Sequence, residues 1–91
     1  MNYNSLLNNL EDKLEYLEDN LKVINEMITN LKDKLEYTLD LPFTTQVNID
    51  YERIKARLDR MEIGNELIKA KLYRIEILYN KVFKKWYELQ K

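Results

Sequence analysis

The feature that most constrains this chain is an unbroken alternation of three- and four-residue steps between apolar residues. In the first half the steps connect Leu7, Leu10, Leu14, Leu17, Leu21, Ile24, Ile28, Leu31 and Leu35. In the second half they connect Tyr51, Ile54, Leu58, Met61, Asn65, Ile68, Leu72, Ile75, Tyr79, Val82, Trp86 and Leu89. A period of 3.5 residues is typical of helices that pack along one stripe in a coiled coil. We therefore predict two long helices that meet along these positions, which we call the seam.

The segment between the two patterns contains the only proline. Pro42 lacks a backbone N–H and disfavours helical dihedrals at the preceding residue, so the first helix is expected at about 4–39. We expect a connection at about 40–47 and a second helix at about 48–90, with Thr44, Thr45 and Asn48 as alternative caps. Such a short connection favours an antiparallel hairpin, whereas a single rod kinked at Pro42 is the alternative.

Composition and charge agree with one small all-α domain over residues 1–91. The chain is 45% hydrophobic and 34% charged and has one Gly, which is too few turn formers for a sandwich or barrel. Residues 1–40 carry four Lys and nine acids, a balance of −5, and residues 41–91 carry eleven basic residues and seven acids, a balance of +4. Opposite charges favour folding the helices onto each other, and a register with Leu35 opposite Ile54 would place Tyr3 opposite Trp86.

A lone hairpin has one layer, whereas stable domains enclose a core between two layers. The second helix carries another apolar row away from its seam, formed by Ala56, Ile63, Leu67, Ala70, Tyr73 and Ile77. We call this row the outer strip and predict that it is an interface, most simply of a homodimer that completes a four-helix bundle. A surface for a different protein and singly tolerated surface residues are the alternatives.

One seam position is polar. An Asn within a heptad core lowers stability but fixes register when it meets a polar partner, so Asn65 is a candidate register-setting residue. The alternative is that the seam loosens at Gly64 and Asn65, because glycine is unfavourable inside a helix.

The residue inventory argues against an enzyme. The chain has no His, no Cys and one Gly, which excludes the usual zinc sites, Cys- or His-based catalysis and glycine-rich phosphate loops. Asp59, Glu62 and Glu66 follow helical spacing, but interleaved basic residues favour a solvated face over a magnesium site. We therefore predict no catalytic residue, metal or cofactor, and a non-enzymatic interaction module such as an adaptor, scaffold or inhibitor.

The C-terminal end combines basic and aromatic residues. The aromatics Tyr79 and Trp86 fall on the seam, whereas Lys81, Lys84, Lys85 and Tyr87 do not, so the latter four are candidate contacts for a partner or a nucleic acid. Nucleic-acid binding through this face is the alternative function, and a membrane-surface helix is a further possibility.

Origin and location follow from composition alone. Ten Asn with frequent Lys, Ile and Tyr suggest an AT-rich genome, as in phages and mobile elements. No basic region followed by an apolar run opens the chain, and no transmembrane stretch is evident, so we expect a cytoplasmic protein, in the host cytoplasm if it is viral.

Overall fold

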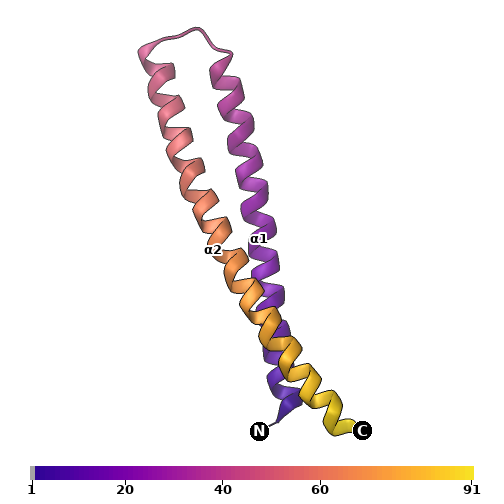
Figure 1. The fold of residues 1–91 in the computed structure, drawn as a ribbon. Coiled ribbons are helices and arrows are strands. Elements are labelled where there is room, and N and C mark those ends of the chain that lie inside the picture. The colour runs from indigo at the N-terminus through magenta and orange to yellow at the C-terminus, as the bar shows by residue number, and fades with distance from the viewer. Residues whose placement is uncertain (1) are drawn as a thin grey trace. The chain divides into compact units, whose positions relative to one another are not determined.

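The computed structural model describes residues 2–91 and contains two α-helices joined by a short turn (Figure 1). Helix α1 spans Tyr3–Leu39 and helix α2 spans Thr45–Gln90. The described residues contain no strand, which confirms the all-α prediction. Because the helix is interrupted between Leu39 and Thr45, a single kinked rod is excluded.

Side-chain caps explain where both helices begin. The Asn2 Oδ1 atom accepts a hydrogen bond from the Ser5 N–H at 3.2 Å, and the Thr44 Oγ1 atom accepts one from the Val47 N–H at 3.1 Å. Each bond satisfies an N–H in the first turn that has no partner within the helix. Thr44 is therefore the cap of α2, which begins at Thr45 and not near Asn48 as the sequence pattern suggested.

The end of α1 is a tightened last turn. The Asp40 N–H donates to the Tyr37 carbonyl at 3.1 Å, and the Leu41 N–H donates to the Thr38 carbonyl at 3.2 Å. Bonds of this three-residue type close a helix terminus, and Pro42 cannot extend it. The proline thus acts as the sequence analysis predicted.

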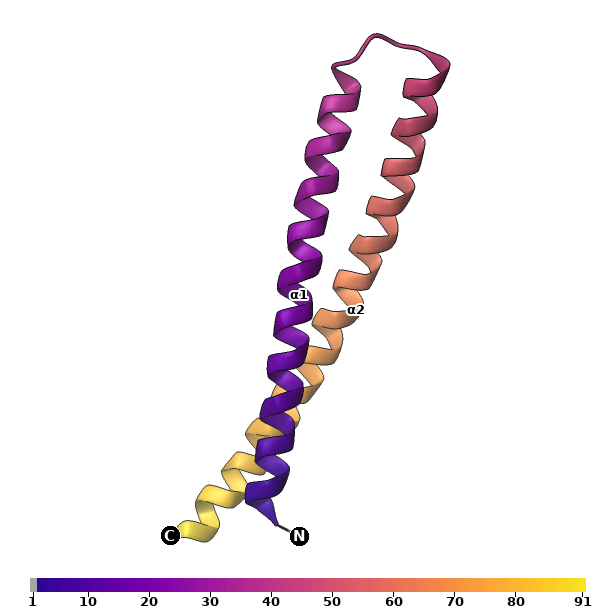
Figure 2. The ribbon, with the colours of Figure 1, turned by 180° about the vertical axis from the view of Figure 1, so that it is seen from behind.

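The helices form two compact units. The turn-side unit comprises residues 22–66, and the terminal unit comprises residues 2–21 with 67–91. In the turn-side unit the two helix segments run antiparallel and lie side by side when seen from either face (Figures 1 and 2). The connection at residues 40–44 therefore joins the two helix segments into a helical hairpin.

Seam residues form the core of the turn-side unit. Ile28, Leu31 and Leu58 are buried together, and the residues packed against them are Ile24, Leu35, Ile54 and Met61. Leu35 and Ile54 border the same cluster, as the register proposed from the sequence requires.

The terminal unit has a second seam cluster. Leu7, Leu10 and Val82 are buried, and the residues packed against them are Tyr3, Leu6, Ile75, Tyr79 and Trp86. The Trp86 ring contacts Phe83, with ring centroids 5.6 Å apart, and Phe83 stacks on Tyr79 at 6.1 Å. Phe83, which the seam pattern left unassigned, therefore joins two seam aromatics on the surface of α2.

The burial pattern corrects the seam at both ends. Leu89 was expected within it but is 67% exposed, because α1 begins at Tyr3 and Leu89 lies almost one turn beyond Trp86. Thr38 continues the seam one step past Leu35 and is buried. Its Oγ1 atom donates to the Lys34 carbonyl at 2.8 Å, so burial leaves this hydroxyl with a partner.

Gly64 provides the first test of this fold. It lies inside α2 without a positive φ, and a Cβ atom added there would have no other atom within 4 Å. Gly64→Ala is therefore expected to raise the free energy of unfolding by about 1 kcal/mol, since alanine restricts the unfolded chain and favours helix. Urea unfolding followed by circular dichroism measures this change, and Ala70→Gly is the matched reverse substitution, with a similar loss. A destabilising Gly64→Ala would mean that another backbone approaches this position.

Candidate interaction surface

Each unit leaves much of its apolar surface uncovered. Six apolar side chains are buried, each with 4–9% of its surface accessible, and none of the described side chains is below 2%. Fifteen large apolar side chains of residues 2–91 are exposed. Because two helix segments side by side bury only one stripe each, apolar residues elsewhere on the helices face solvent.

The outer strip is exposed along α2. In the turn-side unit it includes Ala56 and Ile63, the latter 62% exposed, and in the terminal unit it continues with Leu67, Ala70, Tyr73 and Ile77. Leu67 is 60% exposed. The predicted interface residues therefore remain uncovered within each unit.

Ile49 is an outer-face residue that the sequence analysis missed. It precedes Ala56 by seven residues, and Ile63 follows Ala56 by seven, so the three share one heptad position on α2. Ile49 is 40% exposed. The seven-residue spacing was visible in the sequence, but Ile49 had been assigned near the start of the helix.

Charged residues flank this row in the turn-side unit. On a helix, Glu52 and Asp59 lie to one side of the Ile49–Ala56–Ile63 row, and Arg53 and Arg60 lie to the other. All four side chains are exposed. The apolar row is therefore bordered by one acidic and one basic edge.

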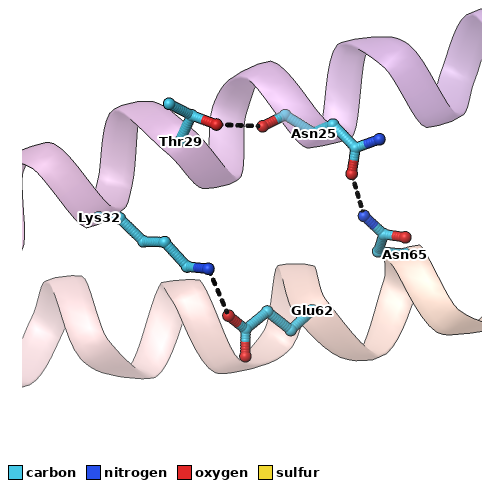
Figure 3. A network of polar contacts seen from close by, with 5 residues as sticks. All are labelled: Asn25, Thr29, Lys32, Glu62 and Asn65. Atoms are coloured by element: carbon cyan, nitrogen blue, oxygen red, sulfur yellow. Dashed lines mark hydrogen bonds and ion pairs between the residues drawn. The ribbon is translucent and has the colours of Figure 1, made fainter.

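The seam has one polar contact within the turn-side unit. The buried Asn65 side chain donates a hydrogen bond from Nδ2 to the Asn25 Oδ1 atom (Figure 3). Asn25, whose carbonyl also accepts from Thr29 Oγ1 at 3.0 Å, lies next to the seam on α1 and was not predicted. The Asn65 Oδ1 atom is buried and has no hydrogen-bond partner among the described residues. Asn65 thus has a polar mate, but only one side of its amide is satisfied.

Asn65→Leu is expected to raise the free energy of unfolding by up to about 2 kcal/mol. A buried acceptor without a partner destabilises the folded chain by about 1–3 kcal/mol, and the substitution removes this penalty. It also removes one hydrogen bond, which contributes about 1 kcal/mol. Asn25 is exposed, so water hydrates its amide in the variant. Urea unfolding tests this expectation, with Asn25→Ala as the matched and destabilising change. A stability loss in Asn65→Leu would indicate that the Oδ1 atom has a partner, such as a second copy.

Glu62, one of the three acidic residues that follow helical spacing on α2, lies near a lysine of α1. Glu62 Oε1 lies 3.8 Å from Lys32 Nζ, and both side chains are about half exposed (Figure 3). Within residues 2–91, Asp59, Glu62 and Glu66 do not gather into a group that could hold a metal ion.

The candidate lysines border an open groove on the terminal part of α2. Leu78 and Val82 contribute apolar surface, and the charged residues lining the groove are Lys81, Lys84, Lys85 and Glu88. Tyr87 is exposed, and the Lys91 Nζ atom lies 5.1 Å from the centre of its ring. Three of the four predicted contact residues therefore line one groove, whereas Tyr87 does not.

In the terminal unit a hydrogen bond links the two helices. Tyr79 Oη donates to Glu11 Oε1 at 2.8 Å. This bond raises the pKa of Tyr79 above its ordinary value, and desolvation and the negative charge of Glu11 act in the same direction. The Glu11 carboxylate is therefore hydrogen-bonded to Tyr79, a seam residue.

Comparison with known protein families, with curated proteins and with solved structures finds no similar protein. Over the described residues, neither helix contains an apolar stretch long enough to cross a bilayer.

Proposed function

We propose that this chain is a non-enzymatic interaction protein that forms a homodimer through the outer strip of α2. Two hairpins packed on these faces make a four-helix bundle. The remaining surfaces of the bundle bind another protein, so that the chain acts as an adaptor, scaffold or inhibitor. The observation that carries the proposal is the exposure of the outer strip, with Ile63, Leu67 and Tyr73 each 60% exposed or more.

The charged edges favour parallel packing of α2 on α2. In a parallel pair related by a two-fold axis, the acidic edge of one copy faces the basic edge of the other, so Glu52 and Asp59 approach Arg53 and Arg60. In an antiparallel pair, acid faces acid and base faces base. Each exposed ion pair contributes only about 0–1 kcal/mol, but like charges in every pair would disfavour the antiparallel arrangement.

Single cysteines test both the dimer and its direction, because the chain has no cysteine of its own. Ile49→Cys, Ala56→Cys and Ile63→Cys are each expected to form a disulfide between copies, since a parallel row keeps every position beside its counterpart. Light scattering on the reduced protein should give twice the chain mass at micromolar concentration. A reduced monomer rejects the dimer, whereas a dimer that cross-links at only one position rejects the parallel direction.

Nucleic-acid binding remains the second candidate function. The lysines at the groove support it, since phosphate contacts require exposed cations. The nearby aromatic rings support it less, because Phe83 contacts Tyr79 and Trp86 and Lys91 lies over Tyr87. Base stacking needs free ring faces. This function predicts affinity for single-stranded DNA that falls steeply with salt, and no binding at low salt rejects it.

A further inference from the structure

We infer that the hairpin turn of one copy docks into the lysine-lined groove of a second copy, a contact separate from the outer strip. The turn offers an apolar tip on an acidic segment, and the groove offers an apolar floor with a basic rim. The inference rests on these two surfaces and does not depend on the proposed dimer.

The turn exposes an apolar tip. Phe43 is 84% exposed, the highest value among the large apolar side chains, and Leu39 is 65% exposed. Phe43 borders an open groove of about 370 Å³, whose other lining residues are Thr38, Leu39, Leu41, Val47, Asn48 and Tyr51. An aromatic side chain with so little cover resembles the anchors that fill pockets in protein interfaces.

The segment around the tip is acidic. Residues 36–52 contain four carboxylates, those of Glu36, Asp40, Asp50 and Glu52, and no basic residue. Asp40 directly precedes Leu41 at the turn. This charge argues against an anionic membrane surface or a nucleic acid as the occupant of the tip.

The groove on α2 has the complementary character. It measures about 470 Å³, and its apolar lining comes from Leu78 and Val82. This apolar lining is bordered by Lys81, Lys84 and Lys85. The one carboxylate among the lining residues is that of Glu88. In the facing α1 segment, residues 2–11, the one acidic side chain is that of Glu11, which accepts a hydrogen bond from Tyr79 Oη. The groove therefore suits a partner that combines an apolar anchor with carboxylates.

A second copy supplies such a partner, since its turn carries Phe43 and Leu41 beside Asp40. The turn and the groove are different surfaces, so the contact is heterologous: each bound copy still has a free turn or a free groove. Such contacts add copies one after another and do not stop at two. They are also expected to weaken with salt, because the charges at their rim are exposed.

The experiment uses two full-length variants that each remove one side of the contact. Phe43→Ser removes the anchor, and Lys84→Glu/Lys85→Glu reverses the rim. Both changes lie on exposed positions, and circular dichroism checks that helicity is kept. Tyr16→Ser and Lys13→Glu/Lys22→Glu are the controls, because they make the same chemical changes on exposed positions of α1.

Sedimentation velocity is expected to show wild-type particles that grow with concentration and shrink with salt. Each variant alone loses this growth, with association weakened about tenfold or more, and the controls retain it. An equimolar mixture of the two variants regains one contact, since one supplies an intact turn and the other an intact groove. When Leu67→Glu is also present in both chains, that contact joins two variant molecules and cannot extend further.

Three results would overturn the inference. They are wild-type particles that do not grow beyond a dimer as concentration rises, growth beyond a dimer that survives in both variants, and variants whose mixture forms no complex. The last result, combined with binding of single-stranded DNA that is lost in the lysine variant, would assign the groove to nucleic acid. Repeating the mixture with Leu67→Glu in both chains separates this contact from the proposed dimer, because the turn–groove complex should persist when the outer strip is disabled.

Discussion

Leu67→Glu is expected to convert the proposed homodimer into a monomer. Leu67 belongs to the outer strip and is 60% exposed in the single chain, so the substitution does not disturb the packing of the seam. In the dimer the new carboxylate would be buried against apolar residues, and the dissociation constant should rise about 30- to 1,000-fold, as for loss of an interface residue worth about 2–4 kcal/mol. Sedimentation equilibrium over a range of concentrations measures this change.

Tyr16→Glu is the matched control for the dimer. Tyr16 is 66% exposed on α1, so the substitution places the same charge on an apolar position outside the outer strip. The control is expected to remain dimeric. If Leu67→Glu and Tyr16→Glu associate equally well, the outer strip is not the contact between copies.

Leu58→Ala is expected to lower the free energy of unfolding by about 2–4 kcal/mol. Leu58 is 8% exposed and packs with Ile28 and Leu31 in the turn-side unit, so truncation leaves a cavity that two helix segments fill incompletely. A loss of this size is a large fraction of the stability of a small domain, about 5–15 kcal/mol. Urea unfolding at fixed protein concentration measures it, since association also contributes to stability.

Leu89→Ala distinguishes burial from sequence pattern. Leu89 has the same residue type and falls on the same heptad seam as Leu58, yet it is 67% exposed beyond the start of α1. Its truncation is expected to change the free energy of unfolding by less than about 0.5 kcal/mol. Equal losses at Leu58 and Leu89 would mean that Leu89 is covered in solution, which a second copy could cause.

The seam was predictable because it depends on a period that the chain maintains throughout. Leu7, Leu31 and Leu58 follow from spacing alone, and all three are buried. Leu89 was assigned wrongly because spacing does not reveal where the opposite helix begins. The sequence could not identify Thr44 as the cap for a similar reason: three nearby residues have suitable side chains, and only Thr44 accepts the Val47 N–H.

The candidate surfaces were predictable only in part. The outer strip followed from helical spacing, whereas Asn25 was overlooked because it lies beside the seam and is recognised only by its bond to Asn65. The lysines were identified from charge, but the groove that they share with Leu78 depends on how side chains are arranged. Phe43 was assigned no role from its sequence position, and its 84% exposure is known only from the structure.

The Asn25–Asn65 bond also restricts which pairings of the two helices are acceptable. A slide of one helix by a heptad would keep leucines and isoleucines in contact but would place Glu18 or Lys32 where Asn25 meets Asn65, which breaks the bond between the two amides. Shifted hairpins should therefore be short-lived intermediates that return to the correct alignment during refolding. In Asn65→Leu we expect slower, multiphasic refolding despite greater stability, because the variant lacks the amide pair that favours the correct alignment.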